Sequence, residues 1–225
     1  EKSDNISLLA EQDDISNVSP SFGIGAGIRV FLGTKDGFVS TNDLTNAGLL
    51  YALNQALGML GLEIGNQNKN NFEGLKILKD FGAEKNNWLS DSPDLNETTL
   101  KLLESTSLLA TKNKNLQVRR ASYSRNWQEV LVAASDGVFA RDIRLHQTVG
   151  VNVIAIKDKN RSTSARRYGS SGNPNDLRNW DIDKSASELN DSAQKMLYAE
   201  FVDAGQMPVV LANKFGGVIF HEACG

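Results

Sequence analysis

The residues best suited to chemistry stand near the end of the chain, where His221 is followed directly by Glu222. A neutral imidazole can bind zinc, and an adjacent carboxylate can take a proton from the water that zinc activates. A His-Glu pair at a helix end is also common as an ordinary solvated or capped terminus. The pair therefore marks a candidate metal site with a general base, and the surrounding sequence has to distinguish these two interpretations.

Three other residues are weaker candidates. His146 lies in an expected strand, has no partner nearby in the sequence, and is expected to have a surface or packing role. Arg166 and Arg167 could hold a peptide carboxylate or a neighbouring domain, although an exposed solubilising pair is the commoner role. Cys224 is the single cysteine, so no disulfide can form within the chain, and a cytoplasmic location is expected.

Composition limits the kinds of molecule that the chain is expected to bind. The 225 residues have a formal net charge of -3 at pH 7, and the basic residues are scattered along the chain. We therefore expect no direct contact with nucleic acid and none with a membrane surface. No apolar run approaches the roughly 18 residues that a membrane-spanning helix needs.

The two ends of the chain look like interior sequence. The first residue is Glu1 rather than Met, and residues 207–225 form the most apolar stretch. Natural termini are usually polar and frayed, and an apolar strand and helix need a surface to bury against. We therefore expect natural sequence to be missing before Glu1 and after Gly225.

Hydrophobic patterns in the first third of the chain predict strands followed by a helix. Alternating and β-branched residues favour short strands up to residue 32. Asp36-Gly37 is typical of a tight hairpin turn, because this pair tolerates positive φ angles. An apolar stripe predicts a helix over residues 45–60, with Asp43 or Thr45 as its cap.

The rest of the chain up to about residue 204 also alternates between helical and strand patterns. A helix is predicted over residues 95–110, and strands are predicted over residues 116–156 with a turn at Asp136-Gly137. The Ser and Gly content of residues 161–174 opposes regular structure and predicts a long loop. Ser185 and Glu188 have the spacing of a capping box, which predicts the start of a third helix.

Together these elements predict an α+β fold with mainly antiparallel strands. Residues 1–64 are expected to form an N-terminal sheet-and-helix domain, residues 65–94 an irregular linker, and residues 95–204 a middle sheet-and-helix domain. Residues 205–225 are expected to begin a third, C-terminal domain. Its first elements are a buried strand over residues 207–211 and a helix from about Gly217 that carries the His-Glu pair.

Several motifs have the order found in one known family. Met207-Pro-Val-Val-Leu, a few loop residues, and Gly217-Val-Ile-Phe-His-Glu-Ala-Cys-Gly225 resemble the signature of the TldD/PmbA family, the so-called modulators of DNA gyrase. The resemblance extends upstream through Ser3-Asp-Asn-Ile, Gly25-Ala-Gly-Ile-Arg-Val30 and Glu129-Val-Leu-Val-Ala-Ala-Ser-Asp-Gly-Val. It therefore covers nearly the whole chain, and the terminal motif is its most specific part.

The resemblance implies roles for the terminal residues. TldD-type subunits carry His-Glu-x-x-x-His, so His221 would be the first zinc ligand and Glu222 the general base of peptide-bond hydrolysis. The second histidine would follow Gly225, and a cysteine ligand would lie far downstream. Zn²⁺ is therefore expected in the full-length protein, whereas this chain alone is expected to be inactive and without bound zinc. Cys224 occupies a variable position of the motif and is not assigned to the metal.

Partners and substrates follow from the same resemblance. TldD-like enzymes work as a heterodimer with a PmbA-like subunit that lacks the motif, and they act on unfolded or extended peptides. Two alternatives stay open: a non-catalytic PmbA-like scaffold subunit, and a binding protein that modulates DNA gyrase. A histidine directly after Gly225 in the longer protein would support the peptidase, and any other residue there would support the alternatives.

Overall fold

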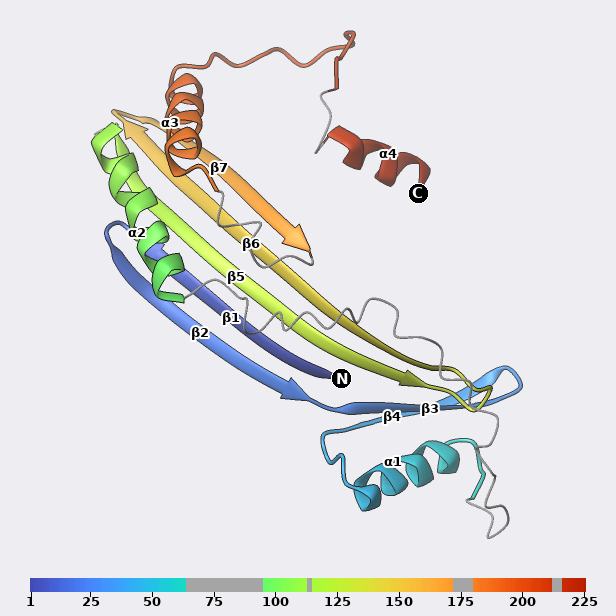
Figure 1. Ribbon diagram of the computed structural model, residues 1–225. Coiled ribbons are helices and arrows are strands. Elements are labelled where there is room, and N and C mark those ends of the chain that lie inside the picture. Colours follow the sequence, from blue (N-terminus) through green and yellow to red (C-terminus); the bar gives the residue numbers. More distant parts are fainter. Residues whose placement is uncertain (64–94, 113–114, 172–179, 212–215) are drawn as a thin grey trace.

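The computed structural model describes residues 1–63, 95–112, 115–171, 180–211 and 216–225 (Figure 1). It has an α+β fold with antiparallel sheets, as the sequence predicts. The strands are β1 (Lys2–Glu11), β2 (Asp14–Ile24), β3 (Ala26–Leu32), β4 (Lys35–Thr41), β5 (Leu116–Ala133), β6 (Phe139–Lys157) and β7 (Asn160–Ser171). The helices are α1 (Asn46–Gly58), α2 (Leu95–Lys112), α3 (Ile182–Leu197) and α4 (Gly217–Cys224).

A five-stranded antiparallel sheet in the order β2-β1-β5-β6-β7 forms the body of the molecule. Its central pairing joins β1 to β5, two strands that are far apart in the sequence. The predicted domains 1–64 and 95–204 therefore both contribute strands to one sheet. The position of the boundary between them stays a prediction, because the expected linker 65–94 lies outside the described residues.

Helices α2 and α3 cover one face of this sheet (Figure 1). On β6, alternate residues from Leu145 to Ala155 are buried, which is the period of a strand with one covered face. On α3 the buried apolar residues recur at helical spacing and are Ala186, Leu189, Ala193 and Leu197. Burial of each large apolar side chain stabilises the fold by about 1.5–3 kcal/mol.

Strands β3 and β4 form a separate two-stranded hairpin that packs against α1. The prediction of a turn at Asp36-Gly37 is wrong. The turn is Gly33-Thr34, and Gly33 has a φ of 63°, which suits a turn with glycine at its first central position. Gly37 instead lies within β4, where a Cβ atom would collide with the carbonyl of Ala56 on α1. The glycine is needed for this close packing.

Two further predictions on the path toward α3 are wrong. Residues 161–171 form most of β7 rather than a loop, because they pair with β6 without interruption despite their Ser and Gly content. The remaining predicted loop residues, 172–174, lie outside the described residues. Helix α3 begins before Ser185, and its cap is Asp181, whose side chain accepts a hydrogen bond from the Lys184 N–H at 2.9 Å.

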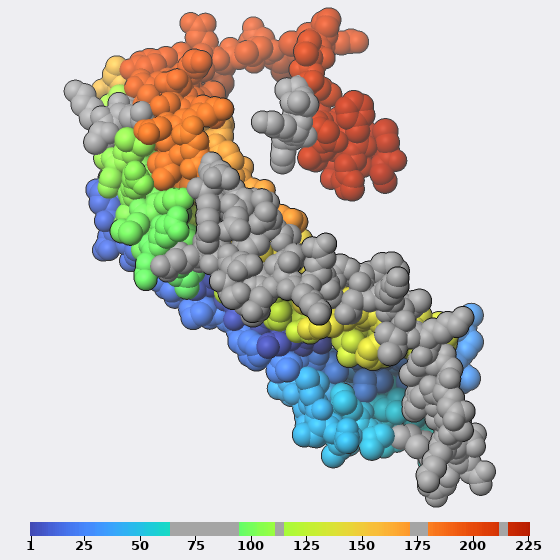
Figure 2. Space-filling model, in the orientation of Figure 1, coloured from blue at the N-terminus to red at the C-terminus, as the bar shows by residue number. Residues whose placement is uncertain are grey.

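The predicted buried strand at 207–211 is also wrong. These residues form neither helix nor strand and are exposed. A strand needs a neighbouring strand for its backbone hydrogen bonds, and none of the described residues pairs with this segment. Figures 1 and 2 show the chain after α3 running away from the sheet toward α4.

Candidate functional site

Helix α4 positions the candidate residues, and its observed start at Gly217 agrees with the prediction. The preceding Gly216 provides no side-chain cap. At the other end, the Gly225 N–H donates to the carbonyl of His221 at 2.9 Å. A helix of 8 residues is too short to be stable alone, so its stability depends on packing. None of its residues is buried against the described part of the chain.

His221 and Glu222 are both exposed on α4. As consecutive helical residues, they project about 100° apart around the helix. Neither side chain forms a hydrogen bond or ion pair with the described residues. Both groups are therefore accessible, as a metal ligand and a proton acceptor need to be, instead of being held in a structural ion pair.

The residues present fit a zinc site in kind but not in number. Imidazole is a common zinc ligand, and a catalytic zinc generally has three protein ligands. Within the described ranges, no group of three or more His, Cys, Asp and Glu side chains is placed to hold a metal ion. The described part of the chain thus brings one suitable imidazole and one carboxylate together, and the roles of His221 and Glu222 stay predictions.

The second histidine, His146, lies on β6 rather than with His221. Its side chain is exposed, and its Nδ1 atom is 2.9 Å from Oγ of Ser171 on β7. The two residues belong to a row of polar side chains that crosses the exposed sheet face: Ser21, Asn5, Asn126, His146 and Ser171. The exposed position of His146 agrees with its predicted surface role. Its partner Ser171 lies 25 residues away in the sequence, so neighbouring residues do not reveal the contact.

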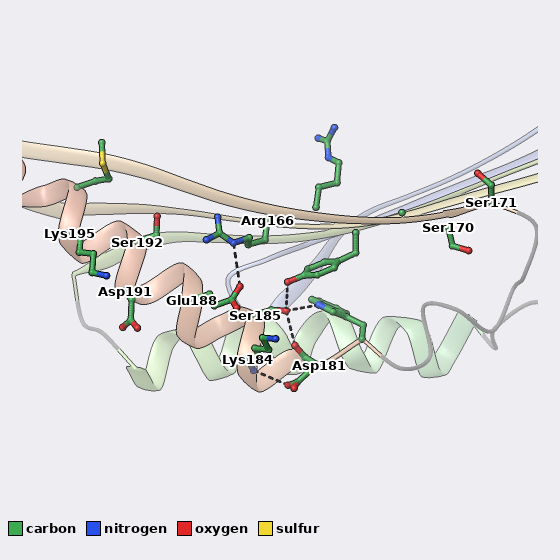
Figure 3. A pocket seen from close by; sticks show the side chains of 15 residues that line it. Arg166, Ser170, Ser171, Asp181, Lys184, Ser185, Glu188, Asp191, Ser192 and Lys195 are labelled. Atoms are coloured by element: carbon green, nitrogen blue, oxygen red, sulfur yellow. Dashed lines mark hydrogen bonds and ion pairs between the residues drawn. The ribbon is translucent and has the colours of Figure 1, made fainter. Parts of the chain in front are cut away.

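Arg166 and Arg167 adjoin a groove of about 1470 Å³ between β7 and α3 (Figure 3). Arg166 reaches across it, and its Nε lies 3.5 Å from Oε2 of Glu188 on α3. Arg167 follows on the strand, so its side chain leaves the opposite face of the sheet. The expected solubilising pair is therefore divided between two faces. The ion pair is half-exposed, and such pairs contribute at most about 1 kcal/mol.

Ser185, which the sequence predicts only as a helix cap, lines the groove and is the centre of a hydrogen-bond network. It is buried, and its Oγ accepts a hydrogen bond from Trp180 Nε1 at 2.8 Å. The same oxygen lies 2.9 Å from the hydroxyl of Tyr168 on β7 and 2.7 Å from the carbonyl of Asp181 (Figure 3). This network ties the start of α3 to the edge strand. Trp180 and Asp181 precede Ser185 by only a few residues, but Tyr168 comes from a different element, and no local pattern indicates that it meets them.

Comparison with known families identifies the chain. Residues 1–60 match the model described as PmbA/TldA metallopeptidase domain 1, and residues 88–197 match the model described as the PmbA/TldA metallopeptidase central domain. The chain belongs to the TldD/PmbA family. The two matches lie on either side of the unmatched residues 61–87, and together they contain every strand of the five-stranded sheet.

One relative in sequence and two solved structures in fold are similar to this chain. A metalloprotease TldD homolog from Haemophilus influenzae is 27% identical over 209 residues, which cover 89% of this chain and 42% of the relative. A Thermotoga maritima protein described as a candidate modulator of a DNA gyrase shares the fold with a TM-score of 0.66 and 14% identity, covering 91% of this chain and 45% of that structure. TldE from Thermococcus kodakarensis shares it with a TM-score of 0.62 and 17% identity, covering 86% of this chain and 42% of that structure.

The length of the match limits what the relatives describe. The chain spans about half the length of the curated relatives that it matches. The metalloprotease names apply to those longer proteins, so a metallopeptidase family is established here, whereas the activity of this protein is not. Among the described residues, no helix is long and apolar enough to cross a membrane.

Proposed function

We propose that the protein is a zinc-dependent peptidase of the TldD type that hydrolyses extended or unfolded peptides. The observation that carries the proposal is the accessible His221-Glu222 pair on α4, in a chain whose family models are described as metallopeptidase domains. Either feature alone would be weak support. Together they combine a chemically suitable pair with a family whose members are named metalloproteases.

Each residue of the pair has a distinct proposed role. Zinc, when bound, supplies Lewis acidity toward a water molecule and toward the scissile carbonyl. His221 would hold the ion through its neutral imidazole. Glu222 would take a proton from the attacking water and deliver it to the leaving amine nitrogen. We place the remaining ligands in the part of the relatives' length that this chain does not span.

We further propose that the protein works in the cytoplasm as a heterodimer with a PmbA-like subunit. The support is its family membership and the fold that it shares with a protein named TldE. A pull-down of a protein of the relatives' full length with a PmbA-like subunit from the same organism, followed by sedimentation analysis, would test this pairing. A stable homodimer that excludes the second subunit would contradict it.

The second candidate function is a non-catalytic scaffold or a modulator of DNA gyrase. It is favoured by the description of the Thermotoga maritima protein, whose fold this chain shares. The presence of His221 and Glu222 favours the peptidase instead. A protein that binds gyrase, holds no zinc and cleaves no peptide would establish the second candidate.

The peptidase proposal is tested in a protein of the relatives' full length, together with its partner subunit. We expect zinc binding and peptide hydrolysis in the unchanged protein. Glu222→Gln should keep the zinc and lose about 100-fold or more in kcat, because the amide preserves size but cannot act as a base. His221→Ala should lose both zinc and activity.

The nearby thiol provides a matched control for these variants. Cys224 is exposed on the same helix, so Cys224→Ala should keep both zinc and activity. Metal analysis and a peptide-cleavage assay are applied to all four proteins. Undiminished hydrolysis by Glu222→Gln, or a full complement of zinc in His221→Ala, would overturn the assigned roles.

A further inference from the structure

We infer that the free edge of β7, together with the groove beside it, is a docking site for an extended peptide that adds a sixth strand to the sheet. Strand β7 ends the sheet, and none of the described residues pairs with its outer side. The site belongs to the sheet and does not include α4. Binding there would hold a peptide without cleaving it.

The hairpin between β6 and β7 determines which backbone groups are available. Its turn contains only Asp158 and Lys159, and Lys157 lies opposite Asn160. Asp158 has a φ of 55°, as such tight turns require. In a two-residue hairpin the residues that flank the turn form a hydrogen-bonded pair, and bonded and non-bonded pairs then alternate along the ladder.

This alternation divides β7 into two sets of residues. The even-numbered residues direct their N–H and C=O groups toward β6. The odd-numbered residues direct theirs away from the sheet. The outward set is Arg161, Thr163, Ala165, Arg167, Gly169 and Ser171. Their donors and acceptors repeat every second residue, and an extended backbone is the structure that matches this repeat.

The two edges of the sheet are protected differently. Edge strands are usually shielded by proline, by bulges or by charged side chains. Strand β2, at the other edge, contains Pro20, and its pairing with β1 is irregular at Leu9 and Ala10. Strand β7 contains no proline and pairs with β6 without a register shift. Of the three kinds of protection, β7 has only charged side chains, namely its arginines. It is therefore the edge more open to strand addition.

The groove provides room for side chains on the covered face of an added strand. Tyr168 and Trp180 contribute aromatic surface, with ring centroids 6.0 Å apart, and Met196 on α3 adds an exposed apolar side chain. Lys184 and Asp191 lie on the same helix, so the lining carries both signs of charge. Successive residues of an added strand would face this lining and the exposed sheet face alternately.

These features identify the ligand as an extended peptide with a weak sequence preference. The main-chain hydrogen bonds do not depend on side-chain identity, whereas the aromatic surface favours apolar residues at alternate positions. That the docked peptide is also a substrate rests on the proposed peptidase function. Docking itself does not, because the β7 edge is separate from His221 and Glu222.

The test uses the 225-residue chain, labelled with ¹⁵N, and a capped seven-residue peptide of alternating Thr and Val. We expect the peptide to slow hydrogen exchange at the odd-numbered amides of β7, while the even-numbered amides, already bonded to β6, change little. The same peptide N-methylated at alternate residues cannot form the ladder. Its affinity should fall about tenfold or more, since several hydrogen bonds are lost.

A substitution gives an independent arm. Ala165→Pro removes one outward N–H and should leave the bonds to β6 in place, because an edge strand tolerates proline there. Its affinity for the unmethylated peptide should fall about tenfold, with an unchanged circular dichroism spectrum. If the variant misfolds, the N-methylated peptide still decides the question.

The inference would be overturned by equal affinity for the methylated and unmethylated peptides, by protection that does not alternate along β7, or by protection on β2 instead. Alternating protection that grows with protein concentration in the absence of peptide would show that a second copy of the chain occupies the edge, and would overturn it as well. All these measurements are binding measurements. Failure of the peptidase proposal would leave them unchanged.

Discussion

Apolar residues in the sheet-and-helix body and in the segment after α3 have opposite surroundings. Leu189 on α3 is 0% exposed, whereas Phe201 is 104% and Val210 97% exposed. The body has one continuous apolar core between the sheet and the two covering helices, although some of its apolar residues, such as Phe22 on β2, are exposed. The segment after α3 is at least as apolar in sequence over residues 207–220, yet it buries almost none of this surface among the described residues.

The change from buried to exposed apolar residues takes place at the end of α3. Asn160 on β7 donates to the carbonyl of Leu197 at 3.2 Å, and Lys157 donates to the hydroxyl of Tyr198 at 2.6 Å. The hydrogen bond to Tyr198 raises the pKa of Lys157, because it favours the charged amine. The candidate chemistry lies beyond these last contacts. The residues that form the core are therefore not those of the candidate site, and we expect that each set can be changed without affecting the other.

The largest effect is expected from the core of the body. Leu189→Ala should lower the free energy of unfolding by about 2–5 kcal/mol, because it leaves a cavity in a packed interior. Leu211→Ala, in the exposed segment, is the matched control and should change it by less than about 0.5 kcal/mol. Urea unfolding measures both. Equal losses in the two variants would show that the segment is packed like the body.

The cap of α3 should have the next largest effect. Asp181→Ala removes the acceptor for the Lys184 N–H and should cost about 1 kcal/mol. Asp183 lies in the same first turn, is exposed, and forms no cap, so Asp183→Ala isolates the loss of a charge near the helix start. Thermal unfolding of both variants separates the two contributions. A larger loss for Asp183→Ala would contradict the assigned cap.

Tyr123 links the stability of the body to pH. Burial raises the pKa of its hydroxyl above the usual value, and the hydroxyl donates to Gln147 Oε1 at 3.1 Å. A raised pKa in the folded state means that this contribution is present below the unfolded pKa and is lost as the pH rises through the folded pKa. Tyr123→Phe should lose about 1 kcal/mol at neutral pH through the missing hydrogen bond.

Raising the pH from neutral to values above the unfolded pKa of about 10 should lower the free energy of unfolding of both the variant and the unchanged chain. The loss should be smaller in Tyr123→Phe, because this variant has no hydroxyl to ionise at that position. Chemical unfolding at a series of pH values measures this difference. Tyr51→Phe removes a hydroxyl from an exposed tyrosine and is measured beside Tyr123→Phe as the matched substitution. Parallel curves for Tyr123→Phe and the unchanged chain would contradict the prediction.

The smallest effects are expected in the exposed segment itself. His221→Ala and Glu222→Gln should each change the free energy of unfolding of the 225-residue chain by less than about 0.5 kcal/mol, because neither side chain has a partner among the described residues. Urea unfolding checks this. A loss above 1 kcal/mol would reveal a structural role and would weaken the proposed separation of chemistry from stability.

Local sequence patterns predicted some elements well and others poorly. Helices α1 and α2 and the turn at Asp136-Gly137 were found, because apolar spacing, a Thr45 cap and a turn dipeptide act over a few residues. The Ser and Gly content of β7 predicts a loop, whereas its extended form depends on pairing with β6. Asp36-Gly37 predicts a turn, whereas the close approach of α1 explains the glycine.

The candidate site shows the same division. The adjacent His221 and Glu222 could be recognised from residue types and from their resemblance to a family motif, and their positions on one helix followed from the local pattern. The Ser185 network and the open edge of β7 could not be anticipated, because they join residues from different elements.

Residue types and short-range spacing were enough to predict the α+β class, most of the helices, the family and the pair of residues suited to zinc chemistry. The pairing of β1 with β5, which joins distant segments in one sheet, became visible only in the folded chain. Tertiary structure also decided which strands form the edges of that sheet and which apolar residues are buried. These properties depend on contacts between residues far apart in the chain, which short-range spacing does not encode.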